Sequence, residues 1–141
     1  MNRTGTGKYE ALLVRCRDFD PVPTAVVHPC EQSALAGPLE AAEKGLITPI
    51  LVGPRAKIAE VAERAGLTLG KTEIIDVPHS HAAAAKAVEL VREGRAELLM
   101  KGSLHTDELL AAVVSREAGC APAGASVMCS SWTCRAITRC S

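Results

Sequence analysis

The sequence predicts an α/β domain built on a parallel, doubly wound sheet. Short apolar segments alternate with amphipathic helical segments between residues 24 and 118, a rhythm typical of consecutive βαβ units. Aromatic residues are scarce: Tyr9, Phe19 and Trp132 are the only ones. Ala, Val, Leu and Ile must therefore fill the core, which suits helix–sheet contacts. At 141 residues the chain has room for one such domain.

The first expected elements are a helix, a connector and a strand. Residues 1–8 are expected to be a disordered start. A helix is predicted at 9–16, because apolar side chains recur there on one side at helical spacing. Two prolines mark residues 18–23 as a connector. The apolar run at 24–27 then predicts a short buried strand.

Two helices and a second strand are expected next. The helix predicted at 33–44 has an inward apolar stripe and ends at Gly45, a typical C-terminal cap. The second strand, at 48–52, is apolar and ends in Gly-Pro. A helix at 54–65 follows and stops at Gly66. The helix residues expected to face the core are Leu35, Leu39, Ala42, Ile58 and Val61.

The remaining elements repeat this alternation. Residues 73–76 predict a third strand, followed by an Ala-rich helix at 81–93 that Gly94 closes. Residues 97–100 predict a fourth, buried strand, and 106–118 a fourth crossover helix. Because helices join the consecutive strands, the strands should be parallel.

Composition excludes several classes of protein. Sixteen acidic and sixteen basic residues give a formal net charge of zero, so a basic footprint for nucleic acid is missing. No apolar run approaches the ~20 residues that cross a bilayer. The N-terminus shows no apolar segment of the kind found in secretory signals. We therefore expect a cytoplasmic protein that binds neither nucleic acid nor a membrane.

Polar residues gather where the predicted strands end, and the turn at 101–106 is the most informative of these places. In a parallel α/β sheet, ligands bind at the carboxyl ends of the strands. Lys101 brings positive charge there, Gly102 allows close backbone approach, and the free N–H groups of the following helix favour an anion. The candidate ligand-binding residues are His28, Ser33, His79, Ser80, Lys101, Gly102, Ser103, His105 and Thr106. Ser80 and Thr106 could instead only cap their helices.

Other catalytic motifs are weak or missing. The chain has no G-x-S-x-G elbow, no Walker A sequence and no G-x-G-x-x-G after a strand. Cys30 could pair with His79 and His81 as metal ligands or as a thiol–base couple, but the spacing does not require it. Cys30 is more simply interpreted as a small, buried or partly buried thiol. No metal is expected.

Four segments resemble one known family. They are Thr24–Glu31, Gly45–Pro54, Pro78–Ala85 and Leu99–Thr106. Together they resemble the N-terminal half of the phosphate acetyl/butyryltransferase family, and most closely the transferase part of bifunctional enoyl-CoA hydratase/phosphate acetyltransferase proteins. The resemblance covers residues 9–119.

The resemblance implies a reversible reaction in which acyl-CoA and phosphate give acyl phosphate and CoA. It implies a two-domain α/β fold with the site between the domains, a homodimer, and no cofactor, since CoA is a substrate. The 101–106 turn would serve the phosphate side, and His28 to Ser33 with His79 and Ser80 would line the same cleft. The catalytic residues are expected mostly in the second half of the family fold, so this chain alone should be inactive.

The last segment, 120–141, differs from the rest of the chain. It has no Leu, Asp, Glu or Lys, yet it holds four cysteines and the only Trp. Back-translation with GC-rich codons and one restored base near Gly119 yields the peptide GLRTGRRISHVFVMDVPG, which resembles the family's continuation. We therefore expect a frameshifted, irregular tail. A zinc site is the alternative, although the tail has no C-x-x-C pair.

Two other functions stay open at this stage. The chain could be a non-catalytic acyl-CoA or phosphate-binding regulatory module, similar to the transferase-like domains appended to malic enzymes. It could also be an interaction protein whose Cys-rich tail binds metal. Acetyl phosphate formation distinguishes the enzyme from the other two, and zinc content identifies the third.

Overall fold

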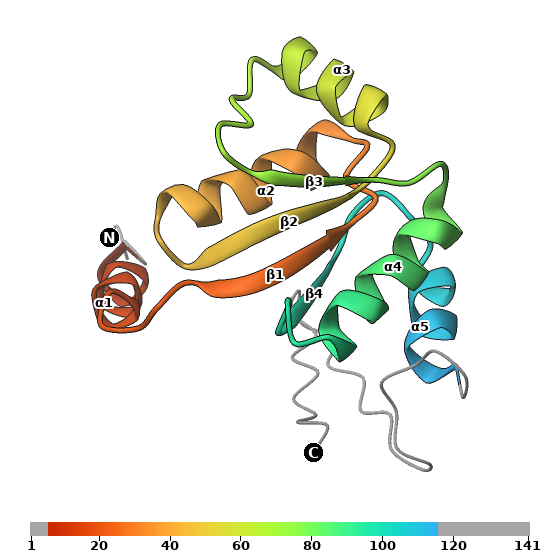
Figure 1. Ribbon diagram of the computed structural model, residues 1–141. Helices are drawn as coiled ribbons and strands as arrows, with labels where there is room; N and C mark the ends of the chain where they lie inside the picture. Colours follow the sequence, from red (N-terminus) through yellow and green to blue (C-terminus); the bar gives the residue numbers. More distant parts are fainter. Residues whose placement is uncertain (1–5, 116–141) are drawn as a thin grey trace.

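The computed structural model describes residues 6–115. Helices and strands alternate along this part of the chain, as predicted (Figure 1). The elements in order are α1 (Thr6–Cys16), β1 (Val22–Val27), α2 (Gln32–Glu43), β2 (Ile47–Gly53), α3 (Arg55–Ala65), β3 (Glu73–Asp76), α4 (Ser80–Arg92), β4 (Leu98–Lys101) and α5 (Thr106–Val114).

The strands form one parallel sheet in the order β3-β2-β1-β4. Helices α2 and α3 cover one face of this sheet, and α4 and α5 cover the other (Figure 1). This arrangement confirms the predicted doubly wound α/β class. The order also places β1, the first strand, between β2 and β4, which decides where the candidate site lies.

The core has two layers because side chains alternate along the inner strands. Ala25 and Val27 of β1 point into the layer under α4, whereas Val26 points into the layer under α2 and α3. Small residues of α4 let that helix lie close to the sheet; Ala83, Ala84 and Ala87 are all buried. Of the helix residues predicted to face the core, Leu35, Leu39 and Ile58 are buried, while Ala42 and Val61 are half-buried.

Helix ends agree with the sequence at glycines and differ elsewhere. Gly45, Gly66 and Gly94 follow helices with positive φ angles, as the predicted caps require. Ser80 does not cap α4, so the interpretation of Ser80 as a helix cap is wrong. His79 does so instead, because its Nδ1 accepts a hydrogen bond of 3.2 Å from the Ala82 N–H.

β1 begins at Val22, inside the predicted connector at 18–23, and the fourth strand and the last helix also differ from expectation. β4 spans Leu98–Lys101 rather than 97–100, and it is only half-buried because it is an edge strand. α5 was predicted to reach residue 118, but it ends at Val114, where Ser115 turns to an extended ψ of 130°. The tail at 120–141 lies outside the described residues.

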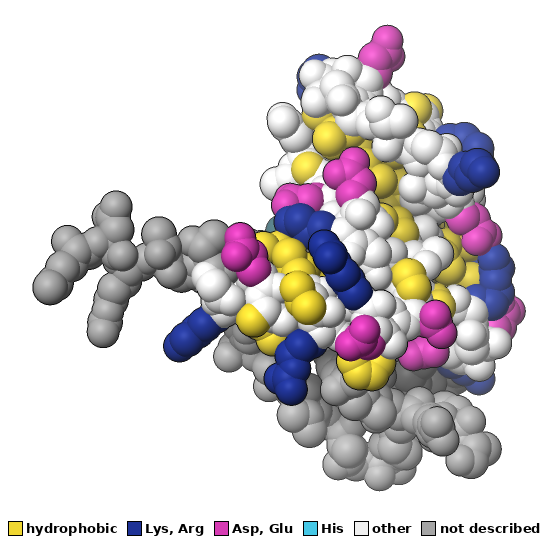
Figure 2. Space-filling view, turned by 90° about the vertical axis from the view of Figure 1, so that its left-hand side faces the viewer, with side chains coloured by type: hydrophobic (Ala, Val, Ile, Leu, Met, Phe, Trp, Pro, Cys, Tyr) yellow, Lys and Arg dark blue, Asp and Glu magenta, His cyan; other side chains and the backbone are white. Residues whose placement is uncertain are grey.

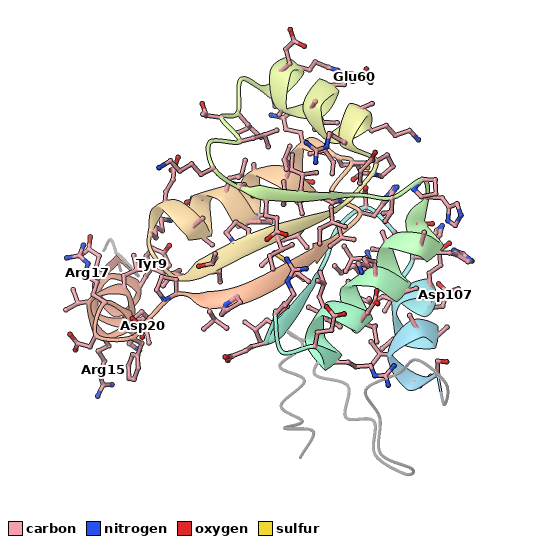
Figure 3. The ribbon with its side chains drawn as sticks, viewed as in Figure 1. Tyr9, Arg15, Arg17, Asp20, Glu60 and Asp107 are labelled. Carbon is pink, nitrogen blue, oxygen red and sulfur yellow. The ribbon has the colours of Figure 1, made fainter. Side chains whose placement is uncertain are left out.

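Helix α1 stands at the margin of the domain. It begins at Thr6, so residues 6–8 of the expected disordered start are helical. Its side chains point mostly outward (Figures 2 and 3): Leu12 is 60% exposed and Val14 is 58% exposed. The Tyr9 hydroxyl joins it to the end of α2 by accepting a 2.8 Å hydrogen bond from Lys44 Nζ. None of the helices in residues 6–115 combines the length and apolar character needed to cross a bilayer.

Candidate functional site

The candidate site lies where β1 and β4 end side by side. From β1 the chain passes to α2 on one face of the sheet, and from β4 it passes to α5 on the opposite face. Two neighbouring parallel strands whose connections diverge in this way leave a crevice at their carboxyl ends, where ligands of open α/β sheets bind. The structure therefore brings together His28, which follows β1, and Gly102 and Ser103, which follow β4.

A compact hydrogen-bond cluster joins the two turns. Val27 pairs with Lys101 at the end of the ladder, and the Gly102 N–H donates to the Val27 carbonyl at 2.9 Å. The Ser103 hydroxyl donates to the His28 carbonyl at 2.8 Å and accepts from the Cys30 N–H at 3.0 Å. Ser103 thus acts as a clamp between the β1–α2 and β4–α5 turns.

His28 has a constrained backbone at the centre of this cluster. Its φ of 53° makes it the one non-glycine residue with positive φ among residues 6–115. Such a conformation is uncommon for a side chain larger than glycine and is often found at functional sites. The His28 carbonyl accepts from the Ser103 N–H at 2.9 Å, from the Ser103 hydroxyl at 2.8 Å and from the Cys30 N–H at 2.9 Å. These bonds hold the turn in place.

The contacts of the His28 ring favour one tautomer. Its Nδ1 lies 3.4 Å from the Ser103 carbonyl oxygen and 3.4 Å from Ser103 Oγ. Because the Ser103 hydroxyl proton is used by the His28 carbonyl, both neighbours of Nδ1 act as acceptors. A proton on Nδ1 satisfies them and leaves the lone pair on Nε2. The proton acceptor of the ring is then Nε2.

Gly102 is required by the backbone of β1. A Cβ atom at this position would lie 2.4 Å from the Val27 carbonyl oxygen and 2.7 Å from the His28 carbonyl oxygen. The close backbone approach expected from the sequence is therefore present, and the group that approaches is the neighbouring strand.

Lys101 carries the positive charge of the site. It is the last residue of β4, not part of the turn as first expected, and it is exposed. Its Nζ donates a long, 3.4 Å hydrogen bond to the Gly102 carbonyl and forms no ion pair within the described residues. The ammonium group is therefore available to an anion.

The first turn of α5 contains two carboxylates that would repel an anion bound at the N-terminus of this helix. Asp107, at the start of α5 in Figure 3, and Glu108 both lie in this turn. His105 occupies the N-cap position but makes no capping hydrogen bond with its side chain, and Thr106 begins the helix. Of the 101–106 turn, Lys101 is thus the better candidate for anion binding.

The other predicted residues lie apart from the cluster. Ser33 is exposed in the first turn of α2. His79 and Ser80 follow β3, which is separated from β1 by β2 in the sheet. Within residues 6–115, no hydrogen bond joins these side chains to His28 or Ser103. Sequence reasoning missed Glu108, whose carboxylate lies 3.4 Å from His81 Nδ1 and links α5 to α4.

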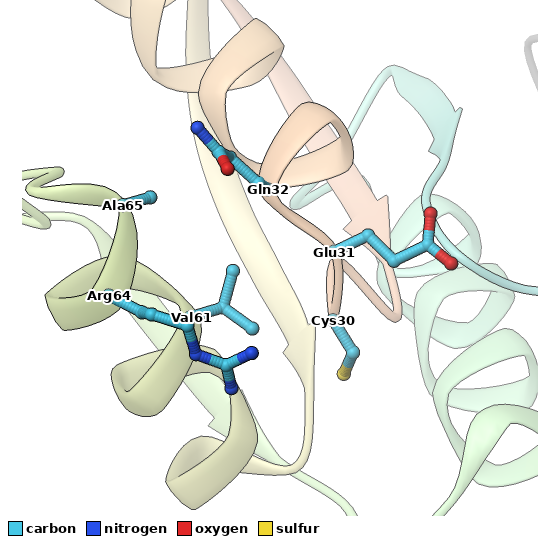
Figure 4. A pocket seen from close by; sticks show the side chains of 6 residues that line it. All are labelled: Cys30, Glu31, Gln32, Val61, Arg64 and Ala65. Carbon is cyan, nitrogen blue, oxygen red and sulfur yellow. The ribbon is translucent and has the colours of Figure 1, made fainter.

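A shallow hollow lies beside the β1–α2 turn (Figure 4). It has a volume of about 240 Å³ and is lined by Cys30, Glu31, Gln32, Val61, Arg64 and Ala65. In Figure 4 the Glu31 carboxylate points away from α3. Arg64 is already paired with Glu60 at 2.6 Å. The α3 residues Val61, Arg64 and Ala65 share one helix face by their spacing, but only the packing of α3 beside α2 brings that face next to Cys30.

Cys30 is a protonated thiol at neutral pH. Burial raises the pKa of the Cys30 thiol, nearby Lys57 lowers it and Glu31 raises it, and the pKa is raised overall. No group of three or more His, Cys, Asp or Glu residues within 6–115 is arranged to hold a metal ion. The geometry therefore supports the interpretation of Cys30 as a partly buried thiol.

We expect Cys30 to react slowly with iodoacetamide near pH 8. A raised thiol pKa leaves less thiolate, so alkylation should be slower than in the urea-unfolded chain. The protonated form contributes stability below the ordinary thiol pKa, and this stability is lost as pH rises through the raised value. Peptide mass spectrometry would follow the modification at Cys30, with Cys16 as the internal comparison. Equal rates in folded and unfolded chains would contradict the raised pKa.

The Ser103→Ala variant should lose about 1–2 kcal/mol of unfolding free energy, because the clamp loses one donor and one acceptor. The Cys30 amide should also exchange its hydrogen faster. Urea unfolding and hydrogen exchange would measure the two effects. Ser103→Thr keeps the hydroxyl and serves as the matched control; if it loses as much stability as Ser103→Ala, the hydroxyl is not the clamp.

Comparison with known proteins identifies related sequences. No family model matches the chain. It is 61% identical to a phosphate acetyltransferase of Rhizobium meliloti over 112 residues, which are 79% of this chain and 35% of that protein. It is 49% identical to a phosphate acetyltransferase of Rickettsia felis over 108 residues, 77% of this chain and 31% of that protein. A phosphate butyryltransferase of Clostridium beijerinckii is 33% identical over 111 residues, 79% of this chain and 37% of that protein.

The solved structures support the fold. The EutD phosphotransacetylase from Staphylococcus aureus superposes with a TM-score of 0.56 at 17% identity, covering 70% of this chain and 39% of that one. The sequence matches, at 61%, 49% and 33% identity, show that the chain is homologous to part of the phosphate acetyl- and butyryltransferases, which confirms the resemblance seen in the sequence. It spans about a third of the length of these curated relatives.

Proposed function

We propose that this chain, as a homologue of part of the phosphate acetyl- and butyryltransferases, is a segment of a phosphate acyltransferase. The complete protein would transfer an acyl group reversibly between CoA and phosphate. The observation that carries this proposal is the 61% identity with a phosphate acetyltransferase over 112 residues. Identity with the butyryltransferase is lower, at 33%, so we propose acetyl as the acyl group.

The chemistry explains what the crevice would contribute. A phosphate oxygen attacks the thioester carbonyl, a C–O bond forms, the C–S bond breaks, and the sulfur leaves as the CoA thiolate, which then takes up a proton. The exposed Lys101 ammonium would bind the phosphate. The lone pair on His28 Nε2 is a suitable proton acceptor for a phosphate or thiol group.

The other predicted residues would have supporting roles in the proposed site. The Ser103 hydroxyl is occupied by the two turns, so its role would be to position His28. Gly102 would allow the strands to approach. Ser33, His79, Ser80, His105 and Thr106 would line the wider cleft. We propose no metal and no cofactor, with CoA acting as a substrate.

The chain matches only about a third of the length of its relatives, and we propose that it is inactive alone. Since about two thirds of the related proteins lie outside the match, the chain alone should not turn over substrate. We propose that the remaining catalytic groups come from the unmatched part, that the complete protein is a cytoplasmic homodimer, and that residues 120–141 result from a frameshift. Sequencing the gene across Gly119 tests the last point: an intact frame that encodes the tail would contradict it.

A chimera provides the functional test. Residues 9–115 of this chain would replace the matched segment of the Rhizobium meliloti phosphate acetyltransferase, and acetyl phosphate formation from acetyl-CoA and phosphate would be assayed. We expect an active chimera and an inactive 141-residue chain. A folded chimera that binds CoA without turnover would instead favour the non-catalytic binding module.

A further inference from the structure

Lys101 combines a fixed backbone with a free side chain. The sheet holds its backbone, because Lys101 pairs with Val27 and the Gly102 N–H donates to the Val27 carbonyl at 2.9 Å. Its ammonium group is exposed and forms no ion pair within residues 6–115. An amine tethered at a fixed point beside the crevice is therefore accessible to a small reagent bound there.

Two other lysines of the domain are held in the protonated form. A hydrogen bond from the Lys44 ammonium to Glu40 raises the Lys44 pKa. Lys86 is bonded to Glu89 at 2.7 Å, which raises the Lys86 pKa. Because only the neutral amine is a nucleophile, such a carboxylate partner makes acylation of a lysine slower. Lys101 has no carboxylate partner in the described part of the chain.

The proposed function would bring an acylating agent to this amine. An acyl phosphate carries a phosphate group, which Lys101 would bind, next to an activated carbonyl. Lysine amines are common targets of acetylation. Holding an amine beside a reactive carbonyl raises the rate of their reaction, because the encounter is no longer bimolecular.

We propose that Lys101 is a self-acylation site, whose ε-amine takes the acetyl group from acetyl phosphate bound at the crevice. The neutral amine attacks the acetyl carbonyl, an N–C bond forms, and the C–O bond to phosphate breaks. Inorganic phosphate leaves, and the proton lost by the nitrogen passes to water. This inference rests on the proposed function, since it takes acetyl phosphate as the ligand.

Acetylation would regulate the same site. The modified side chain has lost its positive charge, so the crevice should bind phosphate more weakly. A high concentration of acetyl phosphate would then slow the complete enzyme, which is a form of control by product.

Incubation of the 141-residue chain with acetyl phosphate tests the site, and peptide mass spectrometry would follow acetylation at each lysine. We expect Lys101 to be acetylated at least roughly ten times faster than Lys71, which is exposed in the turn before β3. Inorganic phosphate should slow the reaction at Lys101 and leave Lys71 unaffected. Equal rates at the two lysines, or no competition by phosphate, would overturn the proposal. The chimera repeats the measurement if the chain does not fold by itself.

A second reagent separates binding from intrinsic reactivity. Acetic anhydride acetylates amines but carries no phosphate group, so it should not prefer Lys101 over Lys71. The same preference with both reagents would overturn the proposal, because Lys101 would then be a reactive amine that needs no bound phosphate.

Matched variants of the chimera test the regulation. Preincubation with acetyl phosphate should lower the rate of acetyl phosphate formation in proportion to the fraction of Lys101 acetylated. Lys101→Arg keeps the charge but removes the amine, so the activity of this variant should resist preincubation. Lys71→Arg should be slowed as much as the parent. A Lys101→Arg chimera that is also slowed as much as the parent would overturn the control by Lys101.

Failure of the proposed function would give a different result. An inactive chimera in which Lys101 is still acetylated selectively would contradict the acyltransferase and leave the modification site intact. An active chimera in which Lys101 reacts no faster than Lys71 would overturn the self-acylation alone.

Discussion

The Gly102→Ala variant is expected to lose about 3 kcal/mol of unfolding free energy, or to fail to fold, because overpacking against backbone cannot be relieved by side-chain movement. The added Cβ would lie 2.4 Å from the Val27 carbonyl oxygen and 2.7 Å from that of His28. The ends of β1 and β4 would have to separate, and the Ser103 clamp would open with them. Urea unfolding followed by circular dichroism measures the loss.

Gly7→Ala is the matched control for this prediction. Gly7 lies in the first turn of α1, and a Cβ there would meet nothing within 4 Å. Alanine in an open helical position should stabilise the chain by about 0.5–1 kcal/mol. The same substitution thus has opposite signs at the two glycines. If Gly102→Ala were as stable as the parent chain, the close contact between the two strand ends would be wrong.

The Lys101→Ala variant of the chimera should lose about 10²-fold in kcat/KM for acetyl phosphate formation, the usual effect of removing one group that stabilises transition-state charge. Most of the loss should appear as weaker use of phosphate, because Lys101 is a cation at the crevice that forms no ion pair among residues 6–115. Stability should change little, since its side chain is exposed and forms only a 3.4 Å hydrogen bond. Initial rates at varied phosphate concentration measure the effect.

Lys71→Ala serves as the control for charge alone. Lys71 is exposed in the turn before β3, away from the β1–β4 crevice. The Lys71→Ala substitution should therefore leave kcat/KM unchanged. If Lys71→Ala and Lys101→Ala lower the rate equally, the effect comes from net charge and the assignment of Lys101 to phosphate fails. A full-activity Lys101→Ala chimera would also rule out that assignment.

The arrangement of elements was largely predictable because local patterns encode it. Glycines with positive φ end three helices at Gly45, Gly66 and Gly94, where the sequence predicted caps. The spacing of Leu35, Leu39 and Ile58 predicted core positions that the structure confirms. Boundaries were less accurate where a tertiary partner decides them. β4 shifted by one residue because its register follows that of β1.

Several tertiary contacts, in the site and elsewhere in the domain, could not be predicted from the sequence. The capping of α3 depends on Asp76 at the end of β3, whose Oδ1 accepts a 2.9 Å hydrogen bond from the Arg55 N–H. The positive φ of His28 depends on bonds from Ser103, which is distant in the chain. Such contacts form only when the strands have paired in the sheet, so no local sequence pattern predicts them.

By itself, the sequence determined the α/β class, the alternation of strands and helices, and the polar character of the strand ends, because hydrophobic periodicity and glycine positions act over a few neighbouring residues. The tertiary structure decided that His28, Lys101 and Ser103 meet and that His79 lies apart. The physical reason is the order β3-β2-β1-β4. Strand order is set by packing and pairing between segments far apart in the chain, and it alone determines which strand ends share a crevice.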